Sequence, residues 1–174
     1  MTKILRYAGI GSRETPFDIC SGMTAIASLL GKAGWHLRSG FAAGADQAFL
    51  MGAQEAGGCF INFLPWKGFN GAPNDPRWVV PNFTWELMEI AASHHPAWNR
   101  CSNMAKRLHA RNVCQVLGMD LKTPVEMVIC WTQGGKGQGG TGQAIRIAQA
   151  HGVPVFDLAT EGQSESLEAF VNSY

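Results

Sequence analysis

The sequence predicts an α/β protein of the Rossmann-like kind, with a single doubly wound, mostly parallel sheet and helices on both faces. Apolar runs of strand length alternate with segments of helical period, and short connections between them favour parallel strands. Glycine-rich turns follow three of the strand-like runs, where open α/β sheets bind ligands. The 174 residues include 21 glycines, about 12% against roughly 7% in an average chain.

The first half of the chain contains three predicted strands and two predicted helices. Thr15 is the expected N-cap of the first helix and Pro16 its expected first residue, because both residue types suit those positions. Apolar residues then recur with a helical period up to Leu30, and Gly34 is the expected C-cap. In chain order, the expected elements are strand 4–10, helix 16–30, strand 35–38, helix 46–56 and strand 59–64.

The second half begins with a long proline-rich loop, 65–82, expected to be either a functional lid or an ordered surface loop. No linker or internal repeat divides the chain, so one domain is expected over residues 1–174. The later elements are expected as helices 86–93, 99–117, 143–150 and 165–172 and strands 125–132 and 153–158.

Composition argues against several classes of protein. Lys and Arg number 14 against 13 Asp and Glu, and this net charge of +1 disfavours bulk nucleic-acid binding. The five cysteines form no C-x-x-C pair, so buried free thiols are expected. His94-His95 has no partner at metal-ligand spacing, so no metal site and no cofactor are expected. No apolar run approaches about 18 residues, so a cytoplasmic protein without a membrane partner is expected.

The three glycine-rich turns favour an anion site. Each follows a predicted strand, so in a parallel sheet they meet at one edge, where glycine admits close approach and helix N-termini accept phosphate. Gly135-Lys136 is followed by Gly137, so the Walker A motif is absent. A G-x-G-x-x-G motif begins at Gly137, but only one predicted strand follows it, which disfavours a nicotinamide dehydrogenase.

Four segments in chain order resemble the motifs of the SLOG superfamily, whose branches include the DprA-like proteins and the LOG-type phosphoribohydrolases. They are Gly9-Ile10-Gly11-Ser12-Arg13, Ser39-Gly40-Phe41-Ala42-Ala43-Gly44-Ala45-Asp46, Arg111-Asn112 and Gly139-Gly140-Thr141-Gly142-Gln143-Ala144. The resemblance implies a Rossmann-like fold, a nucleotide-phosphate site and a homodimer or higher homo-oligomer. The LOG-type motif carries a catalytic Glu, and Ile145 and Arg146 lie where it would fall.

The leading hypothesis is a protein that captures a nucleotide-derived, phosphate-bearing small molecule without turning it over. Arg13 and Arg111 would neutralise the phosphate, and Asp46 would either contact a ribose hydroxyl or hold its loop. Trp66 and Trp78 are expected either to cover the base or to anchor packing. The expected ligand-binding residues are Gly11, Ser12, Arg13, Ser39, Gly40, Gly44, Asp46, Arg111, Asn112, Gly139, Gly140, Thr141 and Gly142.

Two alternatives remain open. A DprA-like module would bind single-stranded DNA, with affinity that falls steeply with salt. A LOG-like phosphoribohydrolase would need a relocated acid, for which Glu14, Asp46 and Asp157 are the candidates.

Overall fold

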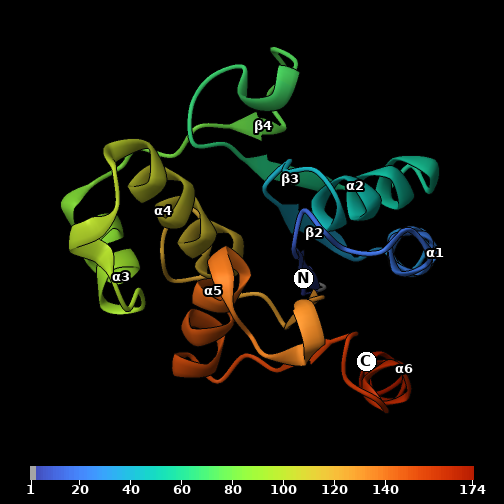
Figure 1. Cartoon of the computed structure of the whole chain (residues 1–174). Coiled ribbons are helices and arrows are strands. Elements are labelled where there is room, and N and C mark those ends of the chain that lie inside the picture. Colours follow the sequence, from blue (N-terminus) through green and yellow to red (C-terminus); the bar gives the residue numbers. More distant parts are fainter. Residues whose placement is uncertain (1–2) are drawn as a thin grey trace.

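A computed structural model describes residues 3–174 and contains one six-stranded sheet in which every neighbouring pair of strands is parallel (Figure 1). The strand order is β4-β3-β2-β1-β5-β6. The predicted Rossmann-like α/β fold is therefore confirmed. The strands are β1 (Arg6–Gly9), β2 (His36–Ser39), β3 (Phe60–Phe63), β4 (Trp78–Val79), β5 (Met127–Cys130) and β6 (Val155–Asp157).

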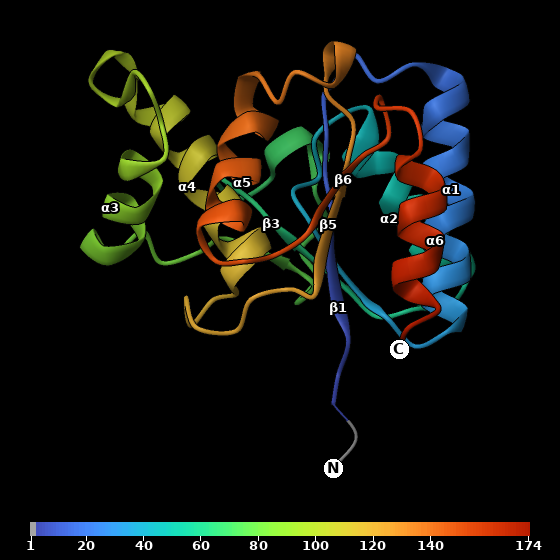
Figure 2. The same ribbon diagram turned by 90° about the horizontal axis from the view of Figure 1, so that it is seen from below.

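Helices cover both faces of the sheet, with α1, α2 and α6 on one side and α3, α4 and α5 on the other (Figure 2). Alternate residues of each strand enter opposite core layers: Tyr7 and Met127 pack on the first side, Ala8 and Val128 on the second. The helices are α1 (Phe17–Lys32), α2 (Ala45–Glu55), α3 (Trp85–Ser93), α4 (Asn103–Leu117), α5 (Gly139–Ala150) and α6 (Gln163–Val171).

The strand order reverses direction at β1. In the register, Ala8 of β1 lies opposite Arg38 of β2 on one side and Val128 of β5 on the other. The chain builds outward from β1 to β4 and then returns to add β5 and β6. The connections after β1 and β5 therefore diverge at the carboxyl ends of these strands, which is where such sheets open a crevice for ligands.

Three local predictions are corrected. Strand β4 lies within the segment predicted as loop 65–82, and its two residues between prolines are too few for a periodic signal. Thr15 is not the N-cap of α1, because Pro16 occupies that position and the Thr15 hydroxyl donates to the Ser12 carbonyl oxygen at 2.7 Å. Helix α5 begins at Gly139 rather than residue 143, so its first turn consists of the glycine-rich motif itself.

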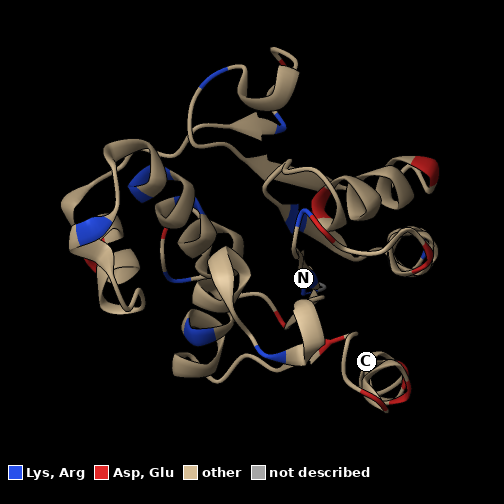
Figure 3. Ribbon diagram, viewed as in Figure 1, with Lys and Arg blue, Asp and Glu red and all other residues tan. Residues whose placement is uncertain are grey.

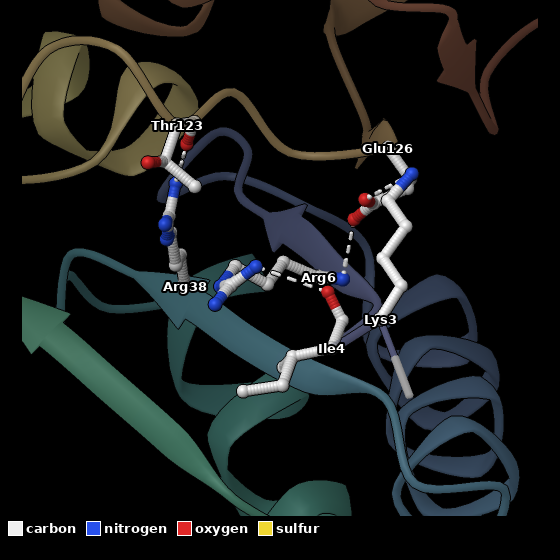
Figure 4. Close-up of polar contacts among 6 residues, drawn as sticks. All are labelled: Lys3, Ile4, Arg6, Arg38, Thr123 and Glu126. Carbon is white, nitrogen blue, oxygen red and sulfur yellow. Dashed lines mark hydrogen bonds and ion pairs between the residues drawn. The ribbon is translucent and has the colours of Figure 1, made fainter. Parts of the chain in front are cut away.

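The amino-terminal edge of the sheet is held by contacts within the protein (Figure 4). Lys3 Nζ lies 3.1 Å from Glu126 Oε1, and the backbone N–H of Arg6 donates to the other oxygen of that carboxylate. Arg38 Nη1 donates to the Thr123 carbonyl oxygen at 2.7 Å. Two of the basic groups at this edge are thus engaged in structural contacts, at the end of the sheet opposite the crevice.

Charge is divided between the two helical layers (Figure 3). Helices α1, α2 and α6 carry mostly acidic residues. In the other layer, α3 carries Glu86 and Glu89, whereas α4 and α5 carry the basic residues Lys106, Arg107, Arg111 and Arg146. Within residues 3–174, no helix combines the length and apolar character needed to cross a membrane. All five cysteines are free, as predicted, but only Cys114 and Cys130 are buried, and Cys59 is exposed.

Candidate functional site

A cavity of about 450 Å³, hereafter the crevice, opens beyond the carboxyl ends of β1 and β5. Three chain segments far apart in sequence form its walls: the turn after β1, the start of α2 and the start of α5, with α4 alongside. Nine of the predicted ligand-binding residues line it: Gly11, Ser12, Arg13, Asp46, Arg111, Asn112, Gly139, Gly140 and Thr141.

The turn after β1 is fixed against both neighbouring segments. The Ser12 N–H donates to the Trp131 carbonyl oxygen at 3.2 Å, and Ser12 Oγ accepts from the Glu14 N–H at 3.0 Å. Gly44 has φ +79°, and a Cβ there would lie 2.6 Å from the Ser12 carbonyl oxygen, so only glycine lets the two turns meet. Arg13 is exposed, which leaves its guanidinium at the rim of the crevice.

Asp46 lies in the first turn of α2 and is only 4% exposed. Its Oδ2 accepts from the Ala42 N–H at 3.1 Å, and the backbone N–H groups of Gly11 and Gly40 lie close enough to stabilise the charge of this carboxylate. Burial raises the pKa of Asp46 to about 6, although Arg111 and these N–H groups oppose the shift. Of the two roles expected for Asp46, contact with a ribose hydroxyl or holding of its own loop, these contacts favour the second.

Arg111 places a buried positive charge in the wall of the crevice. Its Nη1 donates to the carbonyl oxygens of Gly40 and of Phe63, the latter at 3.3 Å, and its guanidinium lies 5.0 Å from the centre of the Phe69 ring. Burial lowers the pKa of Arg111, and the charge of Asp46 opposes that effect. Arg111 thus ties α4 to the ends of β2 and β3 while its charge lines the crevice.

The N-terminus of α5 faces the same space. No side chain caps the helix, so the first N–H groups, at Gly139 to Thr141, keep the donor capacity that helix N-termini offer to anions. Asn112 Nδ2 donates to the Gly140 carbonyl oxygen at 3.2 Å and to Gln143 Oε1 at 3.1 Å. Gln143, fully buried, in turn donates to the Ala91 carbonyl oxygen at 2.7 Å. This chain of amides fixes the position of the α5 N-terminus.

The remaining predicted residues lie outside the lining of the crevice. Ser39 is fully buried, and its hydroxyl donates to the Gly9 carbonyl oxygen at 2.6 Å. Trp78 packs edge-on against Phe41 and Phe60, and Trp66 packs against Phe69, so the contacts of both tryptophans favour the packing role. The predicted residues that do not line the crevice are Ser39, Gly40, Gly44, Gly142, Trp66 and Trp78.

Sequence reasoning missed three polar residues of this region. Gln115 and His109 line the crevice from α4, Gln115 one helical turn after Arg111 and His109 one turn before Asn112, and Gln143 supports Asn112. Burial lowers the pKa of His109, which favours the neutral ring. The helical spacing from Arg111 to Gln115 and from Asn112 to His109 could have identified both residues.

The two positions expected for the catalytic Glu of LOG-type enzymes carry no carboxylate. Ile145 is buried in the core, and Arg146 Nε donates to the His94 carbonyl oxygen at 2.8 Å. The carboxylates that line the crevice are those of Glu14 and Asp46. The third candidate acid, Asp157, instead accepts from the N–H and hydroxyl of Thr132 and lies outside the crevice lining.

Comparison with solved structures supports the fold. The chain is similar to DNA processing protein A from Helicobacter pylori, which binds single-stranded DNA, with a TM-score of 0.55 and 20% identity over 95% of this chain and 72% of that one. It is also similar to the Moco carrier protein of Chlamydomonas reinhardtii, with a TM-score of 0.55 and 15% identity over 99% of this chain and 86% of that one. No family model and no curated protein matches the sequence. The likeness is therefore one of fold, and that fold agrees with the one the SLOG resemblance implies.

Proposed function

We propose that the protein binds a nucleotide-derived small molecule through its phosphate, in the crevice. The observation that carries the proposal is that the uncapped N-terminus of α5 and the buried charge of Arg111 line one cavity. Helix N–H groups and a guanidinium are complementary to phosphate oxygens. A cavity of about 450 Å³ falls within the roughly 300–1,000 Å³ of small-molecule sites.

In this proposal the phosphate lies between the Gly139–Thr141 turn and the Gly11–Arg13 turn. Arg13, exposed at the rim, contacts it from solvent, while Arg111 acts over a longer distance because two carbonyl oxygens already occupy its Nη1. The two fold neighbours are a DNA-binding protein and a cofactor carrier, so ligand binding is a use that this fold serves in other proteins.

The test is calorimetric titration of the full chain with nucleoside mono-, di- and triphosphates and ADP-ribose. Saturable binding of at least one member at a stoichiometry of one supports the proposal, and absence of binding by all members contradicts it. Mass spectrometry of small molecules released from the purified protein by denaturation would identify the natural ligand directly. Arg13→Gln should weaken binding, whereas Lys32→Gln, a charge removal on exposed α1, should not.

Single-stranded DNA is a second candidate ligand. The first turns of α4 carry Lys106 and Arg107, which lie over the rings of Trp98 and Phe83 at 5.6 and 5.2 Å. Cations beside aromatic rings suit the backbone and the bases of a single strand. Binding of an oligonucleotide that weakens steeply with salt and is lost on replacement of Lys106 and Arg107 would favour this candidate.

A phosphoribohydrolase with a relocated acid is a third candidate, and Asp46 is the observation that favours it. Its raised pKa of about 6 leaves part of the carboxyl population protonated near neutral pH, as a general acid requires. Release of free base from nucleoside monophosphates, lost in Asp46→Asn, would support hydrolysis. The homo-oligomer implied by the SLOG resemblance stays a prediction, which sedimentation equilibrium tests.

A further inference from the structure

Three side chains with metal-binding atoms meet beside the crevice. His95 lies in the connection between α3 and α4, Cys101 precedes α4, and His109 lies on α4. Their ligand atoms all lie within 4.8 Å of one another, and all three residues are half-buried. The Cys101 sulfur lies 3.8 and 3.9 Å from the two ring nitrogens of His95, and the two imidazole rings lie 4.3 Å apart between centroids.

These separations are close to those of a bound ion. Zn–N bonds of about 2.0–2.1 Å and Zn–S bonds of about 2.3 Å at tetrahedral angles put ligand nitrogens about 3.4 Å apart and nitrogen and sulfur about 3.6 Å apart. The Cys101–His95 separation exceeds this by only a few tenths of an ångström. The other separations are at most 4.8 Å, so the half-buried side chains would have to rotate to bring all three ligand atoms to one ion.

The hydrogen bonds show what a metal ion would replace at the ligand atoms of His95 and Cys101. His95 Nδ1 accepts from the Ala97 N–H at 3.1 Å, so this nitrogen holds a lone pair, and a metal there would replace the hydrogen bond. The Cys101 thiol donates to the Ala97 carbonyl oxygen at 3.6 Å and would lose its proton on binding.

We infer that His95, Cys101 and His109 bind one zinc ion. Thiolate and imidazole together select zinc among the common divalent ions, and three protein ligands leave the fourth position open, as in catalytic zinc sites. That position adjoins a cavity of about 350 Å³ lined by both histidines and by the residues of the turn that begins α5. When Zn²⁺ binds, the Cys101 thiol becomes a zinc-bound thiolate and its proton is released to solvent.

The zinc site adjoins the crevice but does not depend on the proposed function. His109 lines both cavities, and the connection that carries His95 and Cys101 lies at the same edge of the sheet as the α5 N-terminus (Figure 2). The sequence predicted no metal site because the ligands are separated by five and seven residues across a loop and a helix, a spacing that matches no common zinc motif. The fold, rather than the spacing, brings them together.

The experiment titrates the untagged, metal-free full chain with Co²⁺, which reports thiolate ligation by a charge-transfer absorption, and then with Zn²⁺. We expect one equivalent of Co²⁺, a thiolate-to-cobalt band and displacement by Zn²⁺. Cys101→Ser should abolish the band and weaken Zn²⁺ binding by about a hundredfold or more. Cys59→Ser, at an exposed free thiol, and His151→Asn, on the far end of α5, are the matched controls and should bind as the parent does.

Circular dichroism of the metal-free variants separates loss of ligation from loss of fold, and His95→Asn serves as the ligand variant if Cys101→Ser does not fold. Three results would overturn the inference: no binding of Co²⁺ or Zn²⁺, binding without a thiolate band, or a band and affinity unchanged in the ligand variant. Each is read without any nucleotide present. Failure here therefore leaves the phosphate site untouched, and failure of nucleotide binding leaves the zinc site untouched.

Discussion

Arg111 on α4 donates a hydrogen bond from Nη1 to the carbonyl oxygen of Gly40, the residue that follows β2. The same nitrogen donates to the Phe63 carbonyl oxygen, at the end of β3. One guanidinium from the helical layer therefore joins the carboxyl ends of two strands, and Arg111 also lines the neighbouring crevice. Arg111, which the SLOG resemblance matches to a ligand-binding arginine, therefore also holds the strand ends beside the site in place.

Arg111→Lys should lower the free energy of unfolding by about 1–3 kcal/mol, because the shorter lysine does not place its nitrogen at the Nη1 position and lacks the Nε–H that donates to the Leu108 carbonyl oxygen at 3.4 Å. Urea denaturation measures this change. Arg107→Lys, at an exposed position of the same helix, is the control and should stay within about 0.5 kcal/mol of the parent. Equal effects of the two substitutions would show that the Arg111 contacts contribute no net stability.

Gly40→Ala should destabilise the protein by about 1–3 kcal/mol, because the added Cβ would lie 2.2 Å from Gln115 Nε2 and 2.5 Å from Arg111 Nη1. Gly22→Ala, on exposed α1 where a Cβ meets nothing within 4 Å, should instead stabilise by about 0.5–1 kcal/mol. Thermal or urea unfolding of both variants gives the two signs. A neutral Gly40→Ala would contradict the close approach of α4 to this turn.

The pH dependence of stability should carry a contribution from Asp46. Its pKa is about 6 in the folded protein against 3.8 as the ordinary value, so the folded state binds the proton more tightly. This contribution is fully present below about pH 4 and is lost as the pH rises through 6, amounting to up to about 3 kcal/mol. The unfolding free energy of the parent minus that of Asp46→Asn, measured from pH 4 to 7.5, should fall over this window. A flat difference would place the Asp46 pKa at its ordinary value.

Asn112→Asp should weaken both stability and anion binding, because it replaces the donor shared by the Gly140 carbonyl oxygen and Gln143 Oε1 with an acceptor. We expect a loss of about 1–3 kcal/mol in the free energy of unfolding. Asn172→Asp, at the exposed end of α6, makes the same change without these contacts. If both variants unfold at the same urea concentration as the parent, the amide chain does not hold the α5 N-terminus.

Much of the fold is predictable from the sequence because its strands are apolar and its helices are periodic. The four residues of β5 are all buried, and the apolar run around them is unambiguous. Strand β4 escaped prediction because its two residues carry no periodic signal and owe their conformation to pairing with β3. The first turn of α5 was not predicted because the four residues before Gln143 include three glycines and have low helix propensity. Tertiary contacts such as the hydrogen bond from Asn112 to the Gly140 carbonyl oxygen outweigh that propensity.

The sequence predicted the site residues that lie on turns after the strands. It did not predict those whose role depends on tertiary contacts. Gly11, Ser12 and Thr141 line the crevice because parallel strands deliver their turns to one edge. Ser39 and Trp78 look equally suitable as ligand-binding residues in the sequence. In the structure, however, the Ser39 hydroxyl hydrogen-bonds the neighbouring strand β1, and the Trp78 ring packs against Phe60 at the edge of the sheet. The meeting of His95 with His109 depends on how the α3–α4 connection folds back on α4, which no local pattern encodes.

The most direct test of the phosphate site compares Thr141→Glu with Ser164→Glu. Each adds a carboxylate to the first turn of a helix, where it favours the helix, but Thr141 lines the crevice and Ser164 lies exposed on α6. In calorimetric titration with the tightest-binding nucleotide of the panel, Thr141→Glu should weaken binding at least about tenfold, or roughly 1.4 kcal/mol, with Ser164→Glu unchanged. Undiminished binding by a folded Thr141→Glu variant would contradict a phosphate at the N-terminus of α5.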